Sequence, residues 1–191
     1  MNLRTWTRLA LLAPLALSAC HSTAQPAPAH PPAASAKLES YSCGAIEHLH
    51  TCDGIFLASQ PSADDFHKIK NGGVKTVINL RPPSENKDFD EAQLIGGMGL
   101  AYVNIPFGKP EQLTDEVFAK ARGELGKAQK PILMHCHSAN RVGAIWLAYR
   151  VLDDGLAYDA ALAEAKTVGL TSPALEAKAK DYIQRQHQES P

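Results

Sequence analysis

The sequence has almost no net charge and no basic stripe. Lysine and arginine number 19 against 20 aspartate and glutamate residues, which gives a formal net charge of -1 over 191 residues. Nucleic-acid-binding domains gather lysine and arginine on one face or along one helix. The balance predicts no nucleic-acid partner, so any attraction for an anion must come from a local arrangement of donors.

Cysteine is scarce as well, with four residues at positions 20, 43, 52 and 136. So few cysteines in a chain of this length do not make a disulfide scaffold. The fold must instead rest on a hydrophobic core, and a domain of about 150 residues is large enough to bury one.

The apolar run at the N-terminus is too short to cross a bilayer. It covers residues 9–17, whereas a membrane-spanning helix needs about 20. Arg4 and Arg8 precede the run, and small residues follow it in Leu17-Ser-Ala-Cys20. This order of charge, apolar run and small residues is typical of an export signal.

The end of that signal resembles the lipobox of bacterial lipoproteins. The resemblance implies that residues 1–19 form a signal peptide and that Cys20 is acylated and becomes the mature N-terminus. It also implies an exported protein held by lipid at the periplasmic face of a bacterial membrane. His21 stands where an aspartate would favour the inner membrane, so the outer membrane is favoured. A plain secretory signal cut near Ala19 or Ala24 is the alternative.

Residues 20–37 are predicted to form an extended tether. No aliphatic residue larger than alanine occurs between Ser22 and Ala36, and the first is Leu38. Such a segment cannot bury a core, and its prolines favour an extended chain. The sequence therefore divides into a signal peptide over 1–19, a tether rich in alanine and proline over 20–37, and one globular domain over 38–191.

Strand and helix patterns alternate through the globular domain. Strands are predicted over 54–58, 74–80, 100–105 and 131–135, and helices over 62–71, 89–98, 114–128, 141–152, 157–168 and 173–186. This alternation predicts an α/β fold with a central, mostly parallel sheet and helices on both faces. Ligands bind such sheets at the carboxyl ends of the strands, where Arg81, Cys136 and segment 106–109 are expected to meet.

The most informative motif joins the last predicted strand to a helix. An apolar segment leads into His135-Cys136, four residues follow, and Arg141 opens an amphipathic helix. Backbone N–H groups in such a loop and at the helix N-terminus bind anions and stabilise a thiolate. Arginine presents two parallel donors to an oxyanion. The pattern predicts that Cys136 is a nucleophile facing an anion site.

His-Cys, a short polar loop and an arginine that opens a helix resemble the reactive loop of the cysteine phosphatase superfamily, in its dual-specificity and tyrosine phosphatase-like branch. Two further segments, 57–62 and 73–85, resemble a bacterial phosphatase-like family that occurs fused to beta-lactamase-like hydrolases. The resemblance implies a phosphatase-like fold. It also implies hydrolysis of phosphate monoesters, on a small molecule or a protein, through a phosphocysteine at Cys136, with no metal and no other cofactor.

The resemblance also assigns roles around Cys136. Arg141 binds the oxygens of the transferred group, and His135 helps to fix the loop and the state of the thiol. Contacts with the substrate fall to Arg81 and to the four residues of the loop, which are His137, Ser138, Ala139 and Asn140.

The loop departs from the phosphatase pattern in three ways. Four residues rather than five separate Cys136 from Arg141, Ala139 stands where the resembling loops carry glycine, and Val142 replaces a hydroxyl residue that assists the second step. A positive φ at Ala139 would cost about 1 kcal/mol. The shorter loop also resembles that of rhodanese sulfurtransferases, so transfer of a persulfide at Cys136 is the alternative chemistry. A non-catalytic, anion-binding lipoprotein is a third interpretation.

The general acid is not identified by the sequence. The resembling phosphatases carry an aspartate on the loop before the reactive segment, and here that region offers only Asp115 and Glu111 as weak alternatives. Asp115 also fits the first turn of the following helix, where a negative charge suits the helix dipole.

Cys43 and Cys52 remain once the other two cysteines have roles. An exported protein meets an oxidising compartment, so a disulfide between them is predicted, with a contribution of about 2–3 kcal/mol. The alternative is a metal site on one face of a strand, with His48, His50 and Cys52 at alternate positions.

Overall fold

The computed structural model describes residues 36–85 and 87–189. The predicted signal peptide, the lipidation site Cys20 and all of the tether but its last two residues lie outside the described residues. The strands are β1 Glu39–Ser40, β2 Leu49–Cys52, β3 Ile55–Ala58, β4 Thr76–Asn79, β5 Ala101–Asn104 and β6 Ile132–His135. The helices are α1 Ala63–Asn71, α2 Glu91–Gly97, α3 Asp115–Lys127, α4 Asn140–Leu152, α5 Tyr158–Val168 and α6 Pro173–Glu189, with short 3-10 turns η1 Pro83–Glu85 and η2 Pro110–Gln112.

One six-stranded sheet forms the centre of the domain, in the order β1-β2-β3-β6-β4-β5. Strands β3, β6, β4 and β5 are parallel, and β1 and β2 add an antiparallel edge. His135, the last residue of β6, pairs with Ala58 on one side and Asn79 on the other. The carboxyl ends of the three strands therefore lie level with the start of the reactive loop. The predicted mostly parallel sheet is confirmed.

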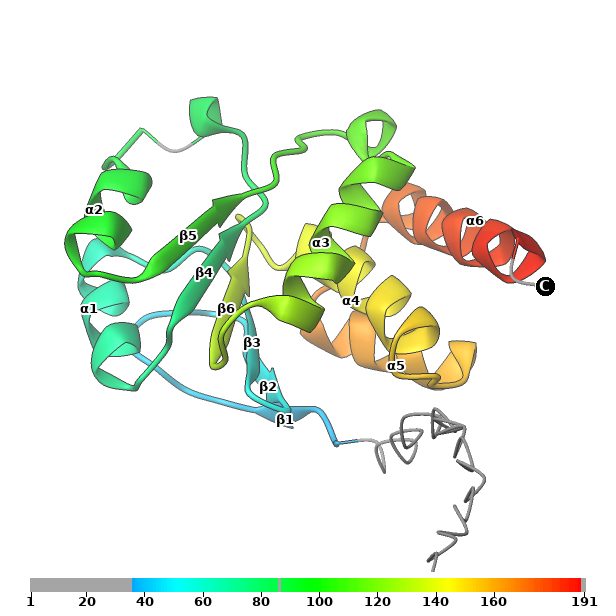
Figure 1. Cartoon of the computed structure of the whole chain (residues 1–191), viewed down its shortest axis with the longest axis horizontal. Helices are drawn as coiled ribbons and strands as arrows, with labels where there is room; N and C mark the ends of the chain where they lie inside the picture. Colours follow the sequence, from blue (N-terminus) through cyan, green and yellow to red (C-terminus); the bar gives the residue numbers. More distant parts are fainter. Residues whose placement is uncertain (1–35, 86, 190–191) are drawn as a thin grey trace, which may run out of the picture. The chain divides into compact units, whose positions relative to one another are not determined.

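Helices cover both faces of the sheet, as predicted (Figure 1). α1 and α2 pack on one face, around a core that includes Phe66, Val77 and Ile95. α3, α4, α5 and α6 pack on the other face in the larger core. α4 is buried from Val142 to Val151, because α5 and α6 pack on it on the side away from the sheet.

Two of the predicted helices begin at residues whose side chains cap them. Ser62 caps α1 by accepting from the backbone N–H of Asp65, whose carboxylate in turn accepts from the backbone N–H of Ser62. Thr114 caps α3 in the same manner by accepting from Val117 N–H. Side-chain oxygens of this kind satisfy donors that the first helical turn leaves unpaired.

The predicted disulfide between Cys43 and Cys52 is wrong, because both thiols are free. Cys52 ends β2 and packs in the core on the α4 face, where its Sγ lies 3.1 Å from the carbonyl oxygen of Ala36. Cys43 packs against the core on the α1 face. The sheet thus separates the two sulfur atoms, which spacing along the chain did not reveal.

The alternative metal site is not found either. His48 precedes β2 rather than lying in it. No group of three histidine, cysteine, aspartate or glutamate side chains within 36–85 and 87–189 is placed to hold a metal ion.

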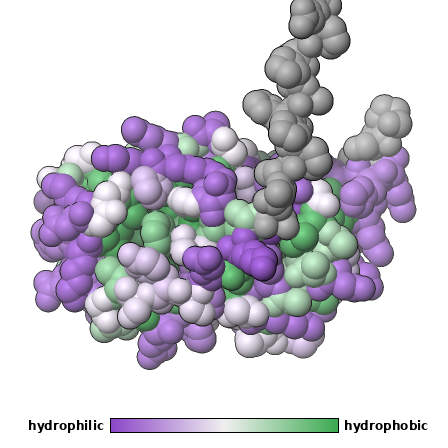
Figure 2. All heavy atoms as spheres, turned by 90° about the horizontal axis from the view of Figure 1, so that it is seen from below, coloured by the Kyte–Doolittle hydropathy of each residue, from purple (hydrophilic) through white to green (hydrophobic). Residues whose placement is uncertain are grey.

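The surface around the β1 edge mixes hydrophilic and apolar residues (Figure 2). Tyr41 is the large hydrophobic residue that is exposed there, with 53% of its surface accessible. None of the helices within the described ranges is both long and apolar enough to cross a membrane.

Two glycine substitutions test the packing of α4. A Cβ at Gly143 would lie 2.8 Å from the carbonyl oxygen of Ala165 and 2.9 Å from the backbone nitrogen of Leu170. Gly143→Ala should therefore lower the free energy of unfolding by about 1–3 kcal/mol, because backbone atoms have to move apart. In urea titrations the matched control Gly123→Ala, in α3 with nothing within 4 Å, should instead gain about 0.5–1 kcal/mol. Equal effects would contradict the tight packing at Gly143.

Candidate active site

The reactive loop follows β6 directly. Cys136 is 1% exposed and donates its backbone N–H to the carbonyl oxygen of Ala58 at 3.4 Å. The chain then turns within four residues into α4. Ala139 makes this turn with φ 60° and ψ 0°, a left-handed conformation, and its carbonyl oxygen accepts from Gly143 N–H at 2.9 Å. The positive φ considered for Ala139 is therefore present.

Backbone donors are available along this loop. Within the described part of the chain, the N–H groups of His137, Ser138 and Ala139 donate to no acceptor. The first N–H groups of α4 lack an intrahelical acceptor, as at the start of any helix. A run of free N–H groups beside a cysteine sulfur is an arrangement that binds oxyanions.

The loop side chains do not all face the same way. His137 and Ser138 are exposed and Ala139 is buried. The Asn140 side chain turns to the segment after α5: it donates to Thr171 Oγ1 at 2.8 Å, and its oxygen accepts from Thr171 and Ser172 N–H. Asn140 therefore braces the loop through its side chain, and the substrate contact predicted for it stays a prediction.

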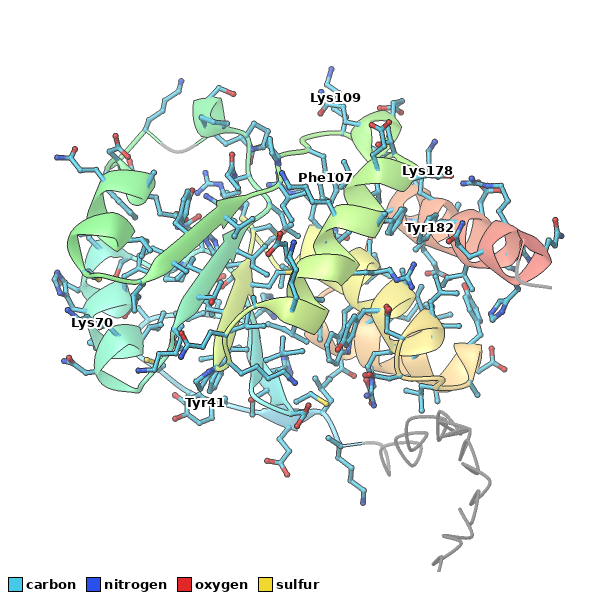
Figure 3. The ribbon with its side chains drawn as sticks, in the orientation of Figure 1. Tyr41, Lys70, Phe107, Lys109, Lys178 and Tyr182 are labelled. Atoms are coloured by element: carbon cyan, nitrogen blue, oxygen red, sulfur yellow. The ribbon has the colours of Figure 1, made fainter. Side chains whose placement is uncertain are left out.

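Arg141 is held by the neighbouring loops. Its Nη1 donates to Glu85 Oε1 at 3.1 Å and to the carbonyl oxygen of Phe107 at 2.7 Å, and its Nη2 donates to Glu85 Oε2 at 2.7 Å. Phe107 lies in the connection from β5 to α3, near the carboxyl ends of the strands (Figure 3). Segment 106–109, which was predicted to meet Arg81 and Cys136 at this edge, thus contacts Arg141 through the carbonyl oxygen of Phe107.

Glu85 is a functional residue that the sequence analysis missed. Burial raises the pKa of its carboxyl, but hydrogen bonds and positive charge from Arg141 and Arg81 outweigh that effect and leave the pKa below its ordinary value. Glu85 is therefore ionised at neutral pH and fixes the Arg141 guanidinium in one plane. Its sequence signal was the end of segment 73–85, four residues after Arg81.

Arg81 reaches Arg141 through Glu85. It follows β4, is 7% exposed, and donates to the Glu85 carbonyl oxygen at 2.6 Å, to Glu85 Oε2 at 3.4 Å and to Gln60 Oε1 at 2.5 Å. These contacts engage all three nitrogen atoms of the guanidinium. The structure thus places Arg81 in contact with Glu85, and its direct contact with the substrate stays a prediction.

His135 is buried and paired. Its Nε2 lies 2.8 Å from Glu91 Oε1, at the start of α2, and Phe66 packs edge-on against its ring. Burial raises the pKa of Glu91, yet its hydrogen bond with His135, the positive charge nearby and the Gln60 amide lower it overall. An ionised Glu91 only accepts, so His135 Nε2 carries the proton. The sequence analysis also missed Glu91.

Neither weak alternative for the general acid fits that role. Asp115 binds Arg185 on α6 through both carboxylate oxygens, and this hydrogen bond holds the Asp115 pKa below its ordinary value. Glu111 is exposed in η2 and lines the same surface hollow as Asp115 and Arg185. Asp115 is the first residue of α3, as its fit to the first helical turn suggested, and it is paired there with Arg185.

Replacing Ala139 tests the strain in the loop. Ala139→Gly should raise the free energy of unfolding by about 0.5–1 kcal/mol. Glycine removes the strain of a left-handed alanine, which costs roughly 1–2 kcal/mol. The greater flexibility of glycine in the unfolded chain offsets roughly 0.5–1 kcal/mol of this stabilisation. Urea titrations measure the change. The control Ala144→Gly, inside α4, should lose about 1 kcal/mol. A loss at both positions would mean that the Ala139 methyl contacts outweigh the strain.

Comparison with known proteins agrees with this geometry. The family described as "Beta-lactamase hydrolase-like protein, phosphatase-like domain" matches residues 49–152. A beta-lactamase hydrolase-like protein of Agrobacterium fabrum is 27% identical over 103 residues, 52% of this chain and 24% of that protein. One of Xylella fastidiosa is 26% identical over 109 residues, 55% of this chain and 25% of that protein. The chain therefore matches about a quarter of the length of these curated relatives.

Solved structures show the same fold. TpbA of P. aeruginosa, in a complex with pTyr, superposes with a TM-score of 0.56 at 25% identity, over 72% of this chain and 83% of that one. PTPMT1, in a complex with PI(5)P, gives a TM-score of 0.61 at 13% identity, over 72% and 94% of the two chains. With a family match over more than half of its length, the chain belongs to the phosphatase-like domain family of beta-lactamase hydrolase-like proteins.

Proposed function

We propose that the chain is a cysteine-dependent phosphatase that hydrolyses phosphate monoesters without a metal. The observation that carries the proposal is the Cys136–Arg141 loop, in which free N–H groups follow a buried cysteine and an arginine is locked in place by Glu85. A cysteine that served only to fill the core has no need of such a loop.

In the proposed reaction the Cys136 thiolate attacks phosphorus and forms a P–S bond, while the P–O bond to the leaving group breaks. Water then attacks the phosphocysteine, which releases inorganic phosphate and restores the thiolate. Arg141 and the loop N–H groups stabilise the equatorial oxygens as charge develops on them. Val142 supplies no hydroxyl for the second step, so breakdown of the phosphocysteine is expected to limit turnover.

The surroundings of the loop favour aryl esters as substrates. Glu85 is held ionised and Asp115 is paired with Arg185, so neither is a proton donor for the leaving group. A phenolate, with a pKa near that of tyrosine, about 10, leaves without such help more readily than an alkoxide. The complex of TpbA with pTyr supports the same class of substrate, namely a phosphotyrosine-like group on a small molecule or a protein.

The proposed location is the periplasmic face of the outer membrane, with Cys20 lipidated after removal of residues 1–19. The start of the described domain lies away from the proposed nucleophile. The carbonyl oxygen of Ala36 accepts hydrogen bonds from Cys52 and Arg150. Cys52 pairs with Ile55 of β3, and Ile55 pairs with Ile132, the first residue of β6. Cys136 follows the opposite end of β6, so the domain begins at the end away from the nucleophile.

A sulfurtransferase is the second function to test. The four-residue loop favours it, since the terminal sulfur of a persulfide is smaller than a phosphate group. In that reaction Cys136 would take a sulfur atom from thiosulfate, releasing sulfite, and pass it to cyanide as thiocyanate.

Parallel assays with p-nitrophenyl phosphate and with thiosulfate plus cyanide distinguish these functions. We expect slow hydrolysis of the phosphate ester, insensitive to chelators and inhibited by vanadate, and no activity in Cys136→Ser. Arg141→Lys should lower kcat/KM by the equivalent of about 2–3 kcal/mol, because lysine cannot present two parallel donors. Fast thiocyanate formation with an untouched phosphate ester would establish the sulfurtransferase, and activity in neither assay would leave the non-catalytic interpretation.

Glu85→Gln tests how Arg141 is held. The amide keeps the size of the side chain but removes its charge and one acceptor, so kcat/KM should fall by about 10-fold or more through misplacement of the guanidinium. Asp115→Asn is the matched control, since it weakens an ion pair outside the loop, and it should leave kcat/KM within twofold. The reverse pattern would identify Asp115 as the acid.

Glu85→Gln also has a signature in the stability of the fold. Because the folded pKa of Glu85 is lowered, its ion pairs stabilise the wild type fully above the unfolded pKa of about 4.3. That contribution disappears as the pH falls through the lower folded value. The difference in unfolding free energy between wild type and variant should therefore shrink in acid.

A further inference from the structure

We propose that Gln60 is a positioning residue of the reactive site. Its side chain joins the residues that support Cys136 to those that support Arg141, and so fixes the position of Cys136 relative to Arg141. The proposal rests on the proposed phosphatase function. Gln60 follows β3 in the segment Leu57-Ala-Ser-Gln-Pro-Ser62, to which no role in the chemistry has yet been assigned.

The backbone of this segment binds the start of the reactive loop. Ala58 accepts from the N–H of Cys136 at 3.4 Å, and the N–H of Gln60 donates to the carbonyl oxygen of His137 at 3.2 Å. The two residues that begin the loop are therefore bonded to Ala58, which ends β3, and to Gln60, which follows it, so Gln60 lies beside the loop.

The Gln60 amide lies between opposite charges. Its Oε1 accepts from Arg81 Nη1 at 2.5 Å, and its Nε2 donates to Glu91 Oε2 and to the carbonyl oxygen of Pro61, each at 3.0 Å. A guanidinium only donates and a carboxylate only accepts, so the charges fix which end of the amide faces which group. Both contacts are charge-assisted, which makes them stronger than neutral hydrogen bonds.

Arg81 and Glu91 each contact residues that support one part of the reaction centre, either Arg141 or Cys136. Arg81 binds Glu85, and Glu85 binds both Nη atoms of Arg141. Glu91 binds Nε2 of His135, the residue before Cys136. The single amide therefore links the support of the oxyanion-binding arginine to the support of the nucleophile.

Removing the amide should disturb both halves together. Arg81 is 7% exposed and Glu91 3%, so each of these largely buried charged groups loses a hydrogen bond that held it in place. The positive charge of Arg81 already acts on Glu91, and without the intervening amide the two are drawn towards each other. Glu85 and His135 would shift with them, and Arg141 and Cys136 would lose their mutual alignment.

The first test compares Gln60→Met with Gln93→Met. Methionine matches the length of glutamine without its polar atoms, and Gln93 is an exposed glutamine on α2. With p-nitrophenyl phosphate, Gln60→Met should lower kcat/KM by about 10- to 100-fold and weaken vanadate inhibition at a temperature where circular dichroism shows a folded protein. Gln93→Met should leave both unchanged. A Gln60→Met protein within twofold of wild type in both measurements overturns the proposal.

The second test uses Gln60→Glu and pH, which separates positioning from general destabilisation. The introduced carboxyl faces Arg81 and Glu91. When ionised it still accepts from Arg81 but repels Glu91, and when protonated it can again donate to Glu91. The ratio of kcat/KM for the variant to that of the wild type should therefore rise as the pH falls. A ratio that stays constant or decreases as the pH falls overturns the proposal.

Alkylation of Cys136 separates a failure of this proposal from a failure of the phosphatase function. A wild type that hydrolyses no phosphate ester refutes the proposed function, but iodoacetamide labelling, read at the Cys136 peptide by mass spectrometry, still reports on the nucleophile. Gln60→Met should change the labelling rate of Cys136 several-fold, whereas Gln93→Met should not. Equal rates in wild type and Gln60→Met overturn the role of Gln60 whatever the activity.

Discussion

The short turn from β6 into α4 is the constraint on which the rest of the structure depends. Only four residues separate the end of the strand from the start of the helix, and Ala139 has to adopt a left-handed conformation to complete the turn. The helix then runs directly against the end of α5, where Gly143 leaves no room for a Cβ. A Cβ at Gly169 would lie 3.0 Å from that of Ala139. The loop, α4 and the end of α5 are therefore packed as one rigid unit.

Rigidity of this kind is what an anion-binding loop requires. Free N–H groups bind an oxyanion well only if they do not reorganise when charge develops. Asn140 adds to the constraint, because its side chain ties the first turn of α4 to Thr171 and Ser172. The helices after residue 155 thus support the reactive loop and complete the core, although none of their side chains has been assigned to the chemistry.

Alternating charges fix the other side of the site. Arg141, Glu85 and Arg81 follow one another in contact, and the Gln60 amide continues the series to Glu91. Arg81 and Glu91 are buried members of this series, so removing a partner of either leaves a buried charge less compensated, which is more damaging than the loss of an exposed ion pair. The order of charges therefore determines the position of Arg141 more strictly than any single contact.

Local signals in the sequence predicted the fold. The alternation of strand and helix patterns became a sheet covered by helices, and the apolar runs before residues 81 and 136 became β4 and β6. The same reasoning found Cys136 and Arg141, since both belong to one short motif. It failed for contacts between distant segments. Glu85 meets Arg141 across 56 residues and Glu91 meets His135 across 44, and no periodicity records such pairs.

The error over the disulfide has the same origin. Cys43 and Cys52 are close along the chain but belong to cores on opposite faces of the sheet. Proximity in sequence suggested a bond that packing on different faces ruled out. The pairing of Asp115 with Arg185, 70 residues away, is likewise a contact that the sequence does not record.

The contacts of Arg141 use only some of the N–H donors of its guanidinium. Arginine has five N–H donors. Nη1 donates to Glu85 and Phe107, and Nη2 donates once to Glu85. Within the described chain this leaves Nε–H and one Nη2–H, which lie on the same edge of the planar group. One edge is therefore fixed by protein, and the adjacent edge keeps two parallel donors, the number that two oxygens of a phosphoryl group can accept.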